Sequence, residues 1–142
     1  MVNIVEAQIT DLDAIVQVDR QVIGNTSRKD FIEKAIKQGR CILVNENEDV
    51  AGFLIYDTHF FECTFISLII VSPTKRRKRY ASQMMNYLVR TSPTEKIFSS
   101  TNRSNESMQK VFEANGFIQS GIVENLDEGD PEIIYFKSKS LS

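Results

Sequence analysis

The chain opens with alternating apolar and polar residues over 2–8, which predict a first β-strand. Apolar residues then recur at helical spacing up to about Val22, and a capping-box pattern at residues 10–13 predicts where this helix starts. The same pattern at residues 27–30 starts a second helix, which Gly39 is placed to end in the left-handed conformation. Two helices are therefore expected before the main sheet.

Three apolar runs follow these helices. Residues 41–45 and 50–56 are separated by the polar tetrapeptide 46–49, which predicts a hairpin with a short loop. The third run, 62–71, loses clean alternation over 65–71, as is typical of a strand that is covered on both faces. We therefore expect residues 65–71 to form the central strand of the sheet.

A strong helical pattern comes directly after a run of Lys and Arg residues at 75–79. Its apolar residues follow the i, i+3, i+4, i+7 spacing of a core-facing helix: Ala81, Met84, Met85 and Leu88. The rest of the chain predicts a strand at 97–101, a helix at 105–115, and closing strands at 117–123 and 132–137. The whole pattern predicts one domain over residues 1–142, with an α/β (α+β) fold in which a mixed, mainly antiparallel central sheet of about seven strands is flanked by about four helices.

Composition narrows the classes of function. The 17 basic and 19 acidic residues leave a net charge of -2, which gives no global reason to expect a nucleic acid as partner. Two cysteines and one histidine are too few for a disulfide framework or a metal site. The longest apolar run, 65–71, is far too short to cross a bilayer, and no basic residue precedes Arg20 to support a secretory signal. We therefore expect a cytoplasmic protein that binds no metal, no membrane and no nucleic acid.

The basic run lies between the predicted central strand and the start of a helix, an arrangement that favours phosphate binding. Backbone N–H groups at the start of a helix are not used by the helix itself, and the helix dipole favours negative charge there. Clusters of Lys and Arg also occur in solvated turns and in nucleic-acid or nuclear-import patches. The strand, turn and helix context favours a phosphate ligand over these alternatives.

Residues 76–81 read Arg-Arg-Lys-Arg-Tyr-Ala, and here the sequence resembles the GNAT superfamily of N-acetyltransferases, whose acetyl-CoA motif is R/Q-x-x-G-x-G/A between a central strand and a helix. A second family feature is an Asn that opens a helix ending in an aromatic residue and then Asn-Gly-Phe. Asn105, Phe112 and residues 115–117 match it. The resemblance spans essentially the whole chain and implies an acyl-CoA N-acyltransferase-like fold, acetyl-CoA as cosubstrate and an amine as acceptor.

The resemblance also implies which residues hold the cosubstrate. The backbone of residues 69–71 would bind the pantetheine arm as an added strand, residues 76–81 would cradle the pyrophosphate, and Asn105 would hydrogen-bond the cofactor. Lys75 and Arg77 would meet the 3′-phosphate by charge attraction. The full implied set is Ile69, Ile70, Val71, Arg76, Arg77, Lys78, Arg79, Tyr80, Ala81, Ser82, Asn105 and Phe112.

The chain departs from the family's pattern at three positions. Arg79 stands where the family usually has glycine, a residue used where the backbone comes close to a ligand. Phe112 stands where many relatives have a tyrosine that protonates the departing sulfur, and Phe65 stands where many have a glutamate base. The catalytic candidates that remain are Glu62 as a base and Tyr80 as an acid, with water or Ser107 as further acids.

Two functions stay open on these grounds. The first is direct attack on acetyl-CoA by an uncharged amine of a small molecule, peptide or protein, with much of the acceleration supplied by positioning. The alternative is a GNAT-like protein that binds acyl-CoA with little or no catalysis, motivated by the three departures. The acidic loop 124–132 is expected to be either a rim that attracts a cationic acceptor or an ordinary solvated turn. The sequence also leaves a homodimer open.

Overall fold

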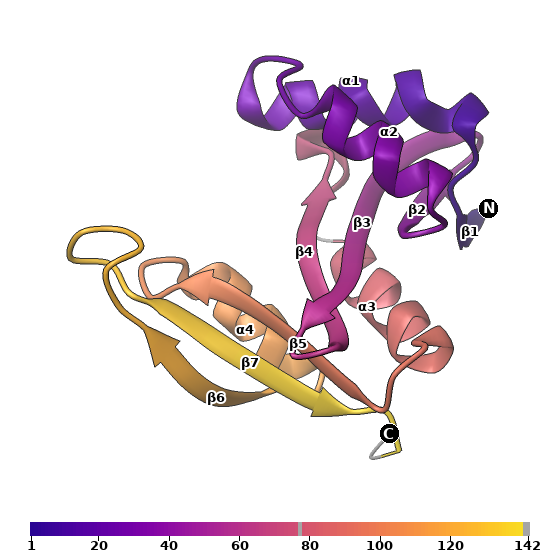
Figure 1. Cartoon of the computed structure of the whole chain (residues 1–142). Helices are drawn as coiled ribbons and strands as arrows, with labels where there is room; N and C mark the ends of the chain where they lie inside the picture. Colours follow the sequence, from indigo (N-terminus) through magenta and orange to yellow (C-terminus); the bar gives the residue numbers. More distant parts are fainter. Residues whose placement is uncertain (77, 141–142) are drawn as a thin grey trace. The chain divides into compact units, whose positions relative to one another are not determined.

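The computed structural model describes residues 1–76 and 78–140, and these form seven strands and four α-helices (Figure 1). The strands are β1 (Val2–Glu6), β2 (Cys41–Glu46), β3 (Asp49–Phe60), β4 (Cys63–Val71), β5 (Lys96–Asn102), β6 (Ile118–Val123) and β7 (Glu132–Ser138). The helices are α1 (Leu12–Ile23), α2 (Lys29–Lys37), α3 (Tyr80–Thr91) and α4 (Glu106–Ala114), with short 3₁₀ turns η1 (Ile9–Asp11) and η2 (Pro73–Lys75).

The strands form one mixed sheet in the order β1-β2-β3-β4-β5-β7-β6. Strand β4 pairs with β5 in parallel, whereas β1 with β2, β2 with β3, β5 with β7, and β6 with β7 pair antiparallel. The parallel register joins Thr64–Ile66 of β4 to residues 97–99 of β5. The predicted fold class is therefore confirmed.

Residues 1–56 and 68–88 form one compact unit. Helices α1 and α2 run side by side in this unit (Figure 1) and bury their apolar faces with β2 and β3. The shared core contains Ile15, Val16, Val18, Ile32, Ala35, Ile36, Cys41, Leu43, Phe53 and Ile55. Met84, Met85 and Leu88 of α3 are fully buried, as the spacing predicted. Burial raises the pKa of the Cys41 thiol to about 12, which disfavours the reactive thiolate at neutral pH.

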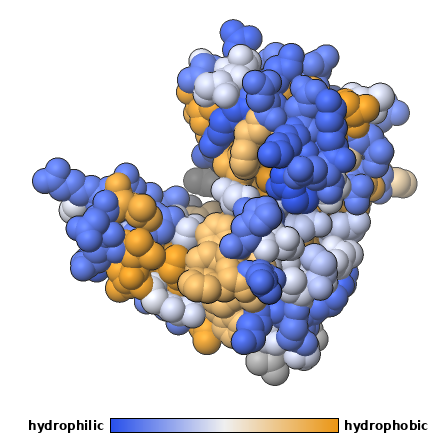
Figure 2. Space-filling view, viewed as in Figure 1, coloured by the Kyte–Doolittle hydropathy of each residue, from blue (hydrophilic) through white to orange (hydrophobic). Residues whose placement is uncertain are grey.

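The second compact unit consists of residues 57–67 and the chain from Val89 onward. Helix α4 lies against one face of its strands (Figure 1), where the ring of Phe112 stacks on Tyr135 with centroids 4.7 Å apart. The other face carries a row of phenylalanine rings whose neighbouring centroids are 5.0 to 5.2 Å apart: Phe60, Phe65, Phe98 and Phe136. Hydrophobic side chains gather over the β6 and β7 region in Figure 2. Ile118 of β6 is 62% exposed. The prediction of a single domain over residues 1–142 stays a prediction.

The two predicted capping boxes were wrong, although both helices exist. The chain enters α1 through η1, and the carboxylate of Asp11 accepts the N–H of Gln8 at 2.8 Å. Helix α2 starts after Arg28, which makes no side-chain cap, and the N–H of Ser27 donates instead to Asn25 Oδ1 at 2.9 Å. The predicted stop at Gly39 is confirmed, because its φ of 72° is left-handed, and Gly116 after α4 has a similar φ of 82°.

The extent of β3 differs from the prediction. The sequence pattern ended this strand at residue 56 and treated 57–61 as a connection, whereas the strand runs to Phe60. The polar residues Asp57, Thr58 and His59 lie within the strand, and the turn is made by Phe61 and Glu62, which have φ values of 51° and 63°. Two left-handed residues without glycine gave no turn signal.

Candidate functional site

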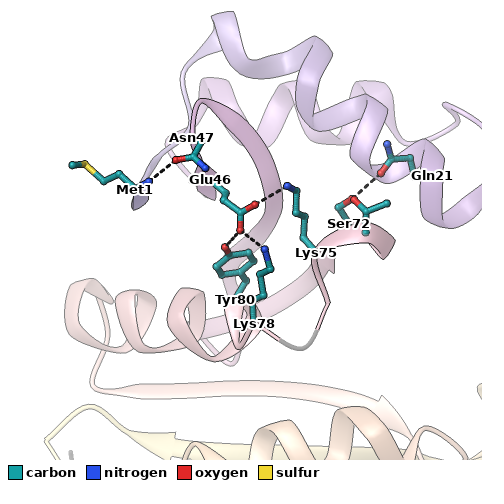
Figure 3. Close-up of polar contacts among 9 residues, drawn as sticks. Met1, Gln21, Glu46, Asn47, Ser72, Lys75, Lys78 and Tyr80 are labelled. Atoms are coloured by element: carbon teal, nitrogen blue, oxygen red, sulfur yellow. Dashed lines mark hydrogen bonds and ion pairs between the residues drawn. The ribbon is translucent and has the colours of Figure 1, made fainter.

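The end of β4 is fixed to its neighbours before the basic turn begins. Ser72 is 4% exposed, and its N–H donates to the carbonyl of Ala51 at 2.8 Å. Its hydroxyl donates to Gln21 Oε1 on α1 at 2.9 Å (Figure 3). Pro73 then starts η2, where the proline ring removes no needed hydrogen bond. The residue directly after β4 is therefore held by hydrogen bonds to both β3 and α1.

The backbone at Arg79 is left-handed, with φ of 61°. Its carbonyl accepts the N–H of Gln83 at 3.0 Å, so that Arg79 directly precedes the first turn of α3. Left-handed backbone costs about 1–2 kcal/mol for a residue with a Cβ, which is why glycine suits such a position. Arg79 therefore keeps the conformation that a glycine would adopt, although its side chain disfavours it.

Replacing Arg79 with glycine is expected to raise the free energy of unfolding by about 1 kcal/mol, because the Cβ clash with the backbone disappears. Arg79→Ala removes the same charge but keeps the Cβ, so no comparable gain is expected. Urea unfolding of both variants beside the unmodified protein provides the measurement. Equal stability of the glycine and alanine variants would show that the left-handed backbone is not the source of strain.

A carboxylate from another part of the chain meets the basic turn. Glu46, the last residue of β2, accepts Lys75 Nζ at 2.6 Å and Lys78 Nζ at 2.9 Å, and it also accepts the hydroxyl of Tyr80 (Figure 3). The side chain of Glu46 is only 13% exposed. The bond from Lys75, followed by those from Lys78 and Tyr80, lowers the pKa of Glu46 from 4.5 to about 2. The same contact with Glu46 raises the pKa of Tyr80.

This pKa makes the stability contribution of Glu46 depend on pH. A carboxyl group whose pKa is lower in the folded than in the unfolded state stabilises the fold above the unfolded value, and this stabilisation is lost as the pH falls through the folded value. The gap in unfolding free energy between the unmodified protein and Glu46→Gln should therefore be constant above about pH 5 and shrink between pH 4.5 and 2. Urea unfolding across this range measures it, and a gap that is unchanged at pH 2.5 would contradict the assignment.

The cations of the turn fall into two groups. Lys75 and Lys78 are paired with Glu46, whereas Arg76 and Arg79 are exposed and have no carboxylate at ion-pair distance within residues 1–76 and 78–140. Arg77 lies outside the described residues. Two guanidinium groups close to the start of a helix are therefore without a carboxylate partner in the described part of the chain, and this combination suits the phosphates of a nucleotide.

The chain matches the sequence model of the acetyltransferase (GNAT) family over residues 10–117, which is most of its length. The protein belongs to the GNAT acetyltransferase family. This match confirms the resemblance, the acetyltransferase class and the family's cosubstrate, acetyl-CoA. No curated protein matches the sequence.

Solved structures of GNAT proteins are similar along the whole chain. A GNAT-family acetyltransferase from Bacillus cereus ATCC 10987 is 64% identical, with 97% of each chain covered and a TM-score of 0.95. The ribosomal-protein-S18-alanine N-acetyltransferase from Escherichia coli is 17% identical, with a TM-score of 0.84 over 100% of this chain and 96% of that one. The yncA protein of Salmonella typhimurium, solved with its cofactor acetyl-CoA, is 14% identical, with a TM-score of 0.79 over 99% and 95% of the two chains.

The GNAT motif residues predicted to hold the cosubstrate lie in both compact units. Residues 69–71 are the half-buried end of β4, and Tyr80, Ala81 and Ser82 form the start of α3, all in the first unit. Asn105 belongs to the second unit, where its side chain accepts the N–H of Met108 at 3.1 Å and caps α4. Phe112 is 1% exposed in the core of that unit. Their roles toward the cosubstrate stay predictions.

The two catalytic candidates occupy different surroundings. Glu62 is exposed in the left-handed turn between β3 and β4. Tyr80 is 4% exposed, and its hydroxyl donates to Glu46. Phe65, at the position where relatives have a base, is half-buried against the ring of Phe60. The roles of Glu62 and Tyr80 as base and acid stay predictions.

Glu46 is the residue that sequence analysis missed. The pattern assigned it to a hairpin loop, and a lone carboxylate at a strand end is usually solvated. Its contacts with Lys75 and Lys78 span 29 and 32 positions of the chain, so that no local signal could reveal them.

None of the helices among the described residues is long and apolar enough to span a membrane.

Proposed function

We propose that this GNAT protein transfers the acetyl group of acetyl-CoA to the α-amine of a small molecule, a peptide or a protein terminus. The observation that carries the proposal is the turn before α3, which keeps a left-handed residue at Arg79 and leaves Arg76 and Arg79 without carboxylate partners among the described residues. Strained backbone persists where the surrounding structure enforces it, and such residues cluster at active sites and at turns that bind ligands. A turn that binds pyrophosphate is such a use.

In this proposal, residues of the first unit bind the cosubstrate. Backbone groups of Ile69–Val71 pair with the pantetheine arm as an added strand, which gives affinity through main-chain hydrogen bonds. The start of α3 and the guanidinium groups of Arg76 and Arg79 meet the pyrophosphate. Residues 69–71 are only half-buried and the two arginines are exposed, so that these groups fit an extended, negatively charged ligand.

The chemistry is direct transfer. The amine nitrogen attacks the thioester carbonyl carbon, the carbon–sulfur bond breaks, coenzyme A leaves as a thiolate, and the nitrogen gives up its proton to solvent water. An α-amine with a pKa near 7.7 is roughly 15% uncharged at pH 7, whereas a lysine amine with a pKa near 10.4 is only about 0.04% uncharged. Phe65 and Phe112 offer neither a base nor an acid at the family's usual positions. An acceptor that is already partly uncharged therefore suits this chain best.

A thiol-release assay tests the proposal. Acetyl-CoA is mixed with the protein and a panel of α-amines and lysine side-chain amines at pH 7, and free coenzyme A is followed with a disulfide dye. Faster release with α-amines than with lysine amines is expected. Faster release with lysine amines would contradict the acceptor class.

The second candidate, acyl-CoA binding with little or no catalysis, has its own supporting observation. Phe112 carries no proton donor and is fully enclosed by the ring of Tyr135 and its neighbours. Calorimetric binding of acetyl-CoA without any thiol release across the panel would favour this candidate over the transferase.

A further inference from the structure

The strand that carries Glu46 is paired along both of its edges. Strand β2 pairs with β1 on one side and with β3 on the other, and Glu46 itself pairs with Val2 and Asp49. The next residue, Asn47, accepts the N-terminal amino group of Met1 at 2.5 Å (Figure 3). Glu46 therefore has a defined position, to which Lys75, Lys78 and Tyr80 anchor the basic turn.

The donors to Glu46 come from several positions along the basic turn. Lys75 donates to Oε1 of Glu46, whereas Lys78 and Tyr80 donate to Oε2, so that both carboxylate oxygens are used. These donors lie before and after Arg76, and Tyr80 directly follows Arg79. Lys78 stays 50% exposed while it is paired with Glu46, whereas Arg76 and Arg79 are exposed and have no carboxylate partner among the described residues.

We propose that Glu46 is a positioning residue that holds Lys75, Lys78 and Tyr80 on the β2 side of the turn, so that Arg76, Arg79 and the start of α3 are ready for the phosphates of coenzyme A. The proposal rests on the proposed function for the identity of the ligand. It assigns the lysines to the shape of the turn and the arginines to the ligand, although all belong to one basic run.

Electrostatics alone leads to the opposite expectation for how replacing Glu46 with a neutral residue changes the affinity for coenzyme A. Removing a negative charge beside a site for a polyanion should strengthen binding, since one repulsive term disappears. A positioning role predicts weaker binding, because the turn loses its preorganised shape. The sign of the change in affinity therefore separates the two roles.

The binding experiment compares three variants by calorimetry with coenzyme A. Glu46→Gln removes the charge, Glu46→Asp keeps the charge but shortens the reach, and Glu48→Gln removes an equal charge from an exposed residue of the same hairpin turn. We expect affinity to fall about tenfold for Glu46→Gln, a smaller fall for Glu46→Asp, and no change for Glu48→Gln. Tighter or unchanged binding by Glu46→Gln would overturn the proposal.

S-acetylpantetheine, which has no phosphate, separates positioning from general damage to the fold. Its affinity, measured by NMR titration, should be the same for the unmodified protein and Glu46→Gln, because the pantetheine contacts come from β4. An equal loss for both ligands would mean that Glu46 only supports the fold, and the proposal would fail.

A ligand-free measurement keeps the proposal independent of the proposed function. Trypsin cleaves after Lys and Arg, so a released basic turn becomes a preferred cleavage site. Mass spectrometry of short digests should show cleavage within residues 75–79 about tenfold faster in Glu46→Gln than in the unmodified protein or Glu48→Gln. Equal rates would overturn the proposal. If the unmodified protein did not bind coenzyme A at all, the proposed function would fail, while faster cleavage in Glu46→Gln alone would still support the anchoring of the turn.

Discussion

Replacing Gly52 with alanine is expected to lower the free energy of unfolding by about 2–3 kcal/mol and to weaken coenzyme A binding. A Cβ at this position of β3 would lie 2.7 Å from the carbonyl oxygen of Ile70, and 3.3 Å from both the Cα of Val71 and the Cε of Met84. Two of these three atoms are backbone, so β3 and β4 must move apart to accept the methyl group. The displaced residues of β4 are those proposed to pair with the pantetheine arm.

Gly24→Ala provides the control for Gly52→Ala. No atom lies within 4 Å of a Cβ added at Gly24, but its φ of 85° makes the substitution strained. This variant should lose about 1 kcal/mol of stability from backbone strain alone and should keep its affinity for coenzyme A. Urea unfolding and calorimetry of both variants provide the comparison. Equal stability loss at the two positions, or unchanged binding by Gly52→Ala, would contradict the role given to close packing of β3 on β4.

Replacing Arg28 with methionine is expected to cost about 3 kcal/mol of unfolding free energy, because a buried carboxylate loses its partner. The side chain of Asp19 on α1 is only 2% exposed, and it accepts Arg28 Nε at 3.0 Å and Nη2 at 2.5 Å. Such a two-point bond joins α1 to the segment that leads into α2. Asp19→Asn should cost less, about 1–2 kcal/mol, because the side chain of Arg28 is 31% exposed and can reach water.

A double-variant cycle tests this asymmetry. Asp19→Leu combined with Arg28→Met removes both charges, and much of the loss seen with Arg28→Met alone should be recovered. Lys37→Met, which breaks the exposed pair between Lys37 and Glu33, serves as the control and should leave stability unchanged within error. Additive losses in the cycle, or a larger loss for Asp19→Asn than for Arg28→Met, would show that the buried charge is not what makes this pair costly to break.

Predictions from apolar spacing were the most successful part of the sequence analysis. Met84, Met85 and Leu88 are all fully buried on α3, because side chains three and four positions apart share one face of any helix. The basic turn was located correctly between β4 and α3 for a related reason, since its position depends on the elements on either side of it in the chain.

Predictions that depended on a single local signal were less successful. Asp13 and Asp30 matched the capping-box spacing, but the entry to α1 uses Asp11, and α2 starts without a side-chain cap. The β3–β4 turn was displaced because Phe61 and Glu62 adopt left-handed backbone that neither residue type announces. Phe60, which comes directly before this turn, packs against Phe98 of a distant strand, and local sequence does not reveal that contact.

The sequence by itself determined the helices, most strands, the basic turn and the family resemblance, because each follows from residues only a few positions apart. The tertiary structure alone decided which cations of that turn are neutralised, since Glu46 reaches Lys75 and Lys78 from a distant strand. It also decided that Arg79 takes the left-handed backbone of a glycine. Hydrogen bonds fix the end of β4 before the turn and the first turn of α3 after it, and these two constraints set the backbone between them. Long-range contacts, and left-handed backbone at a residue other than glycine, are set by the packing of whole elements, which no short stretch of sequence encodes.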